Sequence, residues 1–167
     1  MANDAHVGSC RMIRCGLIGA VLYAKDLRRL VEFYSAVACL DVQSVQEGFA
    51  VLSGESSRLV IVRIPKHIAA SIDISTPPER REDTPVKLVF SVEDIAIVRN
   101  RAAERGGAIA AVEREWEFEG TKVCDGHGPE GNVFQVRRRL RFFSRGCNDK
   151  ANGLHVRLRW KCKEPAA

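Results

Sequence analysis

Two stretches of the chain carry the same pattern: LYAKDLRRL at residues 22–30 and FSVEDIAIV at residues 90–98. The offset is constant, so that Asp94 follows Asp26 by 68 residues. In each copy an apolar strand-like run leads to the aspartate and then to an amphipathic helix. Aspartate at such a junction is typical of an N-cap, whose carboxylate accepts free N–H groups of the first helical turn. The sequence therefore predicts an internal duplication in which both aspartates cap helices.

The residues around these two stretches predict one helix and three further strands in each copy. Gly106-Gly107 is a good end for the second helix, and Glu119-Gly120 and residues 128–131 are expected turns. The buried helix stripes are expected at Leu27, Leu30, Val31 and Tyr34 and at Ile95, Val98 and Ala102. The strands are expected at residues 41–47, 49–53 and 58–64 and at 108–118, 121–125 and 132–137. The order is βαβββ twice, which is an α+β fold.

The chain of 167 residues suits a single folded domain. A Pro-rich segment with alternating charges separates the two copies and is expected to be their linker. The predicted boundaries are an N-terminal extension at residues 1–13, a duplicated domain at 14–137 and a basic extension at 138–167. Within the domain, module one covers residues 14–74, the linker 75–85 and module two 86–137.

Charge and cysteine content narrow the function classes. The net charge is +5, but residues 137–167 hold ten Lys or Arg against two acids, so this end carries +8 and the rest −3. A mildly acidic body argues against a specific nucleic-acid-binding face. The six cysteines form no CxxC pair and no disulfide-scaffold spacing. No signal peptide or membrane span is visible. We therefore expect a cytoplasmic protein with reduced thiols and no membrane partner.

The βαβββ order, Phe33-Tyr34 in the first helix and DGHGPEGNVFQ at residues 125–135 resemble the vicinal-oxygen-chelate superfamily, which includes glyoxalases, bleomycin resistance proteins and extradiol dioxygenases. The resemblance covers residues 14–137. It implies two βαβββ modules whose curved mixed sheets form a cleft, and it implies a homodimer. Some members bind a divalent metal there and catalyse isomerisation, ring cleavage or epoxide opening. Members of the bleomycin-resistance type bind a drug without metal.

In the metal-dependent members, the ligands come from the first and last strands of each module. The resemblance places the first-strand positions seven residues before each capping aspartate, at Gly19 and Lys87. The last strand of module one, RLVIVRIP, has no acid, and Gln135 stands at the fourth position. Glycine has no donor, an ammonium is a poor ligand, and a divalent ion normally needs three or more donors. We expect neither a metal nor another cofactor, as in the bleomycin-resistance type.

Strand alternation predicts which side chains line the cleft. In VEREWEFEG, residues 112–120, four glutamates alternate with Arg114, Trp116 and Phe118. A solvated edge strand would explain this pattern. If the strand borders the cleft, its aromatic side fits a flat ligand, whereas its glutamate side fits a cationic one, and the sequence does not choose. The predicted cleft residues are Tyr23, Lys87, Val89, Ser91, Trp116, Phe118 and Gln135.

These features support three functional hypotheses. The first is a small-molecule-binding protein that sequesters a drug-like or aromatic compound without metal and has no catalytic residues. The second is a lyase, isomerase or dioxygenase of the same superfamily with a non-standard metal site or metal-free acid–base chemistry. Lys87 or His127 would supply that chemistry, although His127 is otherwise interpreted as an exposed turn histidine. The third is an interaction module whose cleft has lost its ligand.

Overall fold

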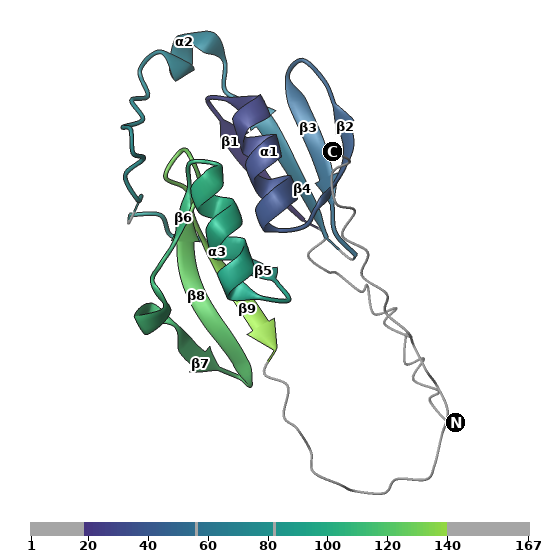
Figure 1. Ribbon diagram of the computed structural model, residues 1–167. Helices are drawn as coiled ribbons and strands as arrows, with labels where there is room; N and C mark the ends of the chain where they lie inside the picture. Colours follow the sequence, from purple (N-terminus) through teal and green to yellow (C-terminus); the bar gives the residue numbers. More distant parts are fainter. Residues whose placement is uncertain (1–18, 56, 82, 140–167) are drawn as a thin grey trace, which may run out of the picture.

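The computed structural model describes residues 19–55, 57–81 and 83–139. The predicted N-terminal extension and most of the basic C-terminal extension lie outside these residues. The predicted βαβββ repeat and the α+β class are confirmed (Figure 1). The first copy contains β1 (Gly19–Ala24), α1 (Leu27–Val37), β2 (Asp41–Val45), β3 (Phe49–Ser53) and β4 (Arg58–Arg63), followed by the short helix α2 (Lys66–Ala69). The second contains β5 (Leu88–Ser91), α3 (Ile95–Glu104), β6 (Ala108–Ile109), a 3-10 helix (Val112–Arg114), β7 (Trp116–Phe118), β8 (Thr121–His127) and β9 (Val133–Arg139).

Both repeated aspartates are helix caps, as predicted. The Asp26 carboxylate accepts the backbone N–H of Arg29 at 3.1 Å. The Asp94 carboxylate accepts the N–H groups of Ala96 at 2.7 Å and Ile97 at 3.2 Å. These bonds satisfy donors that have no partner inside the helix. Local capping chemistry therefore sets where each helix begins.

Each module forms one mixed sheet. The strand orders are β1-β4-β3-β2 and β5-β9-β8-β6, and β7 also pairs with β8. In both sheets the first strand runs parallel to the last one. Val21 pairs with Val60, and Val89 pairs with Gln135. Because Val21 and Val89 are related by the 68-residue offset, Val60 is the first-module equivalent of Gln135.

Helices α1 and α3 lie side by side and share one hydrophobic core with both sheets (Figure 1). The predicted stripes of both helices are buried. The rings of Phe33 and Tyr34 in α1 pack edge-on against Phe134 of the second sheet, with centroids 5.8 and 6.2 Å apart. The rings of Tyr34 and Phe90 also pack together, with centroids 5.8 Å apart. The first helix therefore packs against both modules.

The predicted turn at residues 128–131 ties the modules together. The N–H of Gly131 donates to the carbonyl of Gly128 at 2.9 Å and closes the turn. Glu130 is 4% exposed, and its carboxylate accepts the backbone N–H groups of Lys25 at 3.0 Å and Asp26 at 2.6 Å. The carboxylate thus sits at the N-terminus of α1, where the helix dipole favours a negative charge.

The prediction of one continuous strand at residues 108–118 was wrong. Its two ends, β6 and β7, both pair with β8. Between Ile109 and Trp116 the chain has six residues, whereas their partners Gly126 and Val123 enclose only two. The additional residues leave the sheet, and three of them form the 3-10 helix. The interruption ends at Glu115, whose carboxylate lies 2.6 Å from the guanidinium of Arg99 on α3.

Candidate ligand-binding face

The second sheet has one face covered by helices and one face that we call the open face. Phe134 and Val136 of β9 and Cys124 of β8 point into the core. Side chains alternate across a strand, so the intervening residues point the other way. By strand register the open face carries Val89, Ser91, Val123, Asp125, Gln135, Arg137, Trp116 and Phe118.

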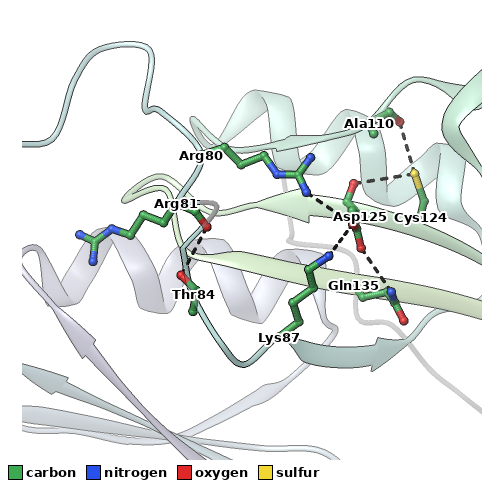
Figure 2. A network of polar contacts seen from close by, with 8 residues as sticks. All are labelled: Arg80, Arg81, Thr84, Lys87, Ala110, Cys124, Asp125 and Gln135. Atoms are coloured by element: carbon green, nitrogen blue, oxygen red, sulfur yellow. Dashed lines mark hydrogen bonds and ion pairs between the residues drawn. The ribbon is translucent and has the colours of Figure 1, made fainter.

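Polar contacts on the open face converge on Asp125 (Figure 2). The ammonium of Lys87, the residue just before β5, lies 2.6 Å from Oδ2 of Asp125. The guanidinium of Arg80, from the linker, approaches the same oxygen at 3.4 Å. The amide of Gln135 on β9 donates to Oδ1 at 3.2 Å. Three segments of the chain therefore meet at one carboxylate.

These partners change the acidity of Asp125. Burial by itself would raise the pKa of this carboxyl group. Hydrogen bonds from Lys87 and Gln135 and the charges of Lys87 and Arg80 outweigh that effect and lower the pKa. Asp125 is therefore a carboxylate at neutral pH, and it is poorly suited to hold a proton for acid catalysis.

The contacts continue from Gln135 to the aromatic side chains of β7. The Nε of Arg137 donates to Oε1 of Gln135 at 2.9 Å. The guanidinium carbon of Arg137 lies 5.0 Å above the centre of the Phe118 ring, which is cation–π geometry. Trp116 is the cross-strand partner of Val123, which in turn pairs with Arg137. Charged and aromatic groups thus share one surface.

The aromatic side of residues 112–120, and not the glutamate side, belongs to the open face. Glu117 pairs across the sheet with Lys122, which points away from the open face. Glu115 binds Arg99, and its side chain is only 8% exposed. Because Glu113 and Arg114 lie in the 3-10 helix, the strict alternation expected for the whole segment was wrong. It holds only within β7.

The predicted cleft residues divide between the two sheets. Lys87, Gln135, Trp116 and Phe118 belong to the second sheet and its polar contacts. Val89 and Ser91 lie on β5 and line a pocket of about 420 Å³ at the junction of the modules. Tyr23 lies on the open side of the first sheet and is 64% exposed. Its role and that of the other predicted cleft residues remain predictions.

The donors at the four ligand positions do not suit a divalent metal. A side chain at Gly19 would collide with the carbonyl oxygen of Arg58, so that position has no room for a donor. Val60 offers only a hydrocarbon side chain. The ammonium of Lys87 is engaged with Asp125, and the amide of Gln135 is held by Asp125 and Arg137. Within the described part of the chain, no group of three or more His, Cys, Asp or Glu is arranged to hold a metal ion.

Two residues near Asp125 differ from their sequence interpretation. His127 is the last residue of β8 and is partly buried, with Nδ1 3.2 Å from the carbonyl oxygen of Gly128. Its interpretation as an exposed turn histidine was therefore wrong. Cys124 is fully buried on the helix-covered face. Burial raises the pKa of the Cys124 thiol, and the opposing hydrogen bond with Arg99 only partly offsets this. Cys124 and Asp125 thus face opposite sides of the sheet.

Sequence reasoning missed Arg80 and gave Asp125 no central role. Arg80 lies 45 residues from Asp125 in the chain, and no local pattern in the linker indicates its position. The alternation of β8 could have placed Asp125 on the same face as Gln135, because the two residues pair across the sheet. That inference requires the register of the hairpin, which the turn at residues 128–131 sets.

Comparisons with known proteins agree with this architecture. A model of the glyoxalase-like domain family matches residues 19–137. A glyoxalase/bleomycin resistance protein/dioxygenase family enzyme from Burkholderia phytofirmans has 16% identity and a TM-score of 0.55, covering 75% of this chain and 100% of its own. A genomically encoded fosfomycin resistance protein from Listeria monocytogenes has 14% identity and a TM-score of 0.55. This match covers 77% of this chain and 96% of the Listeria chain. At these identities the structures establish a shared fold. No curated protein matches.

Proposed function

The chain belongs to the glyoxalase-like domain family, within the vicinal-oxygen-chelate superfamily, and on that premise we propose that it is a small-molecule-binding protein that needs no metal. Its ligand is a flat, partly aromatic compound that lies on the open face of the second sheet. Binding is non-covalent, and the function is sequestration rather than turnover.

One observation carries the proposal. At the second-module position where related enzymes hold a metal, the ammonium of Lys87 lies 2.6 Å from the carboxylate of Asp125. A positive side chain therefore stands where a divalent cation would otherwise be attracted, and like charges repel at such short range. The neighbouring guanidinium of Arg80 adds to this repulsion.

The aromatic groups supply the binding surface. Trp116 is 40% exposed and Phe118 is 46% exposed. Burying such rings under a flat ligand removes apolar area from water, and stacking adds about 0.5–1.5 kcal/mol for each aromatic pair. A few polar groups beside an apolar wall are the usual composition of a small-molecule site.

The first test combines metal analysis with thermal unfolding. We expect protein purified without chelator to contain no stoichiometric metal. A panel of aromatic acids, amines and neutral compounds, each measured with and without EDTA, should include ligands that raise the melting temperature in both conditions, because a compound that binds only the native state stabilises it. Stoichiometric zinc, nickel, iron or manganese would contradict the proposal, and so would a melting shift that EDTA abolishes.

A matched pair of variants locates the binding surface. Phe118→Ala should weaken binding of any active compound by about fivefold or more, given the energy of one aromatic contact. Phe49→Ala is the control, because Phe49 is similarly exposed, at 41%, but belongs to the first sheet. Equal losses in the two variants would place the ligand elsewhere.

A further inference from the structure

The open face of the second sheet has an excess of positive charge around one carboxylate. Lys87 and Arg80 both contact Asp125, and Arg137 on β9, the strand next to β5, is held by Gln135. Among the described residues that the strand register and the Asp125 contacts place on this face, Lys87 and Arg137 already outnumber the one acid, Asp125, for a formal balance of +1. Glu115, the nearby acid of the preceding segment, is directed to Arg99 on the helix-covered side. The electrostatic potential of this face therefore favours an anion.

The cations are also the more accessible partners of the network. The side chains of Lys87 and Arg80 are 40% and 37% exposed, whereas that of Asp125 is 18% exposed. An ammonium has three N–H donors, and the contact with Asp125 uses one of them. A second anion can therefore approach Lys87 from solvent without displacing Asp125 from the sheet.

The distance from the cations to the aromatic groups suits a small acid. Trp116 pairs with Val123, and Asp125 is two residues further along the same strand. Diagonal neighbours of this kind lie about 7–8 Å apart. One aromatic ring with an attached acid group spans a similar length, so a ligand that lies on the β7 side chains can bring its charge to the Lys87 ammonium.

We propose that the ligand is a planar aromatic carboxylate, whose ring lies on Trp116 and Phe118 and whose acid group binds Lys87 and Arg80. This inference deepens the proposed function and rests on it. Asp125 holds the two cations in place when no ligand is bound, and it competes with the ligand for them. Charge on the ligand then determines affinity, and the ring determines where the ligand lies.

Calorimetric titration of the full chain with three matched compounds tests the ligand class. The probes are 2-naphthoate, its neutral amide 2-naphthamide, and cyclohexanecarboxylate, which has the charge without the aromatic ring. We expect 2-naphthoate to bind best. The amide should bind about tenfold more weakly or worse, because it lacks the hydrogen bond from a carboxylate to a charged group. Cyclohexanecarboxylate should bind about fivefold more weakly or worse, because it lacks the aromatic contacts. The affinity for 2-naphthoate should fall with added salt.

Variants of the network test the assigned roles. Lys87→Met should weaken 2-naphthoate binding by about tenfold and leave 2-naphthamide binding unchanged. Lys122→Met is the control, because Lys122 is similarly exposed, at 36%, and paired with Glu115 at 3.5 Å, but points to the other side of the sheet. Asp125→Asn should tighten 2-naphthoate binding, because it removes the competing carboxylate. Circular dichroism of each variant confirms that it is folded.

The outcomes separate this inference from the proposed function. If 2-naphthamide binds as tightly as 2-naphthoate, or Lys122→Met costs as much as Lys87→Met, the acid class is wrong while a metal-free aromatic site remains. If amines or neutral aromatics in the panel bind and no acid does, the inference of an acid ligand is wrong but the proposed metal-free binding function still holds. If no compound in the panel binds, both fail.

Discussion

Asp125 is the residue on which the polar contacts of the open face converge. It accepts from an ammonium, a guanidinium and an amide that come from three segments of the chain. The carboxylate is mostly shielded from solvent, so it needs these partners to offset the cost of burial. Its neighbour Cys124, one residue earlier, faces the core instead. A single step along β8 thus separates a charged site from the packed interior.

The stabilisation that Asp125 provides should depend on pH. Asp125→Asn should lower the free energy of unfolding by up to about 1 kcal/mol near neutral pH, since ion pairs with an accessible partner contribute little. The native pKa of Asp125 lies below its unfolded value. Its stabilisation is therefore complete above the ordinary aspartate pKa and is lost as the pH falls through the lower native pKa.

Urea titrations of both proteins between about pH 6 and about pH 3 measure this effect. The difference between wild type and Asp125→Asn should shrink towards the acid end. Asp41→Asn is the control: Asp41 lies at an exposed position of the first sheet, so this variant shows how the loss of any surface carboxylate changes the free energy of unfolding. A difference that is constant across the range would show that the ion pairs of Asp125 do not stabilise the fold.

Among the elements, α1 is held at its N-terminus by the other module. Its own cap, Asp26, satisfies one N–H of the first turn. Glu130, 104 residues away from Asp26, adds a buried carboxylate that accepts two further backbone N–H groups at the helix start. The turn that presents Glu130 is closed by Gly131, whose positive φ of 79° suits glycine. The second module therefore completes the N-terminus of the first helix.

Removal of the Glu130 carboxylate should destabilise the whole protein. Glu130→Ala should cost about 1–2 kcal/mol, because it leaves two partly buried N–H groups without their acceptor. Glu130→Gln retains one acceptor oxygen and should cost less. Glu32→Ala on the exposed side of α1 is the control, with an expected change within about 0.5 kcal/mol. Denaturant titration measures all three, and a cost for Glu130→Ala no larger than that of the control would refute the capping role.

At the scale of the whole molecule, one core links two sheets that, among the residues the structure describes, share no strand pairing. The aromatic rings of α1 and of the second sheet pack together at the centre of this core. A duplicated chain with separate cores would behave as two domains. This one has the packing expected of a single cooperative unit. In the described part of the chain, no helix is long and apolar enough to cross a membrane.

The shared core predicts one unfolding transition. Calorimetry should give equal calorimetric and van't Hoff enthalpies. Phe134→Leu should lower the stability by about 1 kcal/mol, and hydrogen exchange should show the same loss of protection in β3 and β4 as in β8 and β9. Phe118→Leu, on the open face, should leave core protection unchanged. Two resolved transitions, or a loss confined to the second sheet, would contradict a shared core.

The sequence by itself determined the repeat, the capping aspartates, the helix stripes and the faces of most strands. These features depend on interactions within a few residues or on the period of one element, so local chemistry suffices to predict them. The missing metal donors at Gly19 and Lys87 were also visible, once the family resemblance had given their positions. The fold class followed from these local rules, whereas the cleft-facing residues of the strands at 86–92 and 132–137 followed only once the resemblance had given the ligand positions.

Only the tertiary structure decided how distant segments meet. It placed Arg80 and Lys87 on Asp125, set Glu130 at the start of α1, and diverted the chain out of the sheet before Glu115. It also placed Trp116, rather than the glutamates, on the open face. Each of these contacts joins groups that are far apart in the chain or depends on strand register. Their energies are realised only when folding has brought these distant segments together, so no local pattern can specify them.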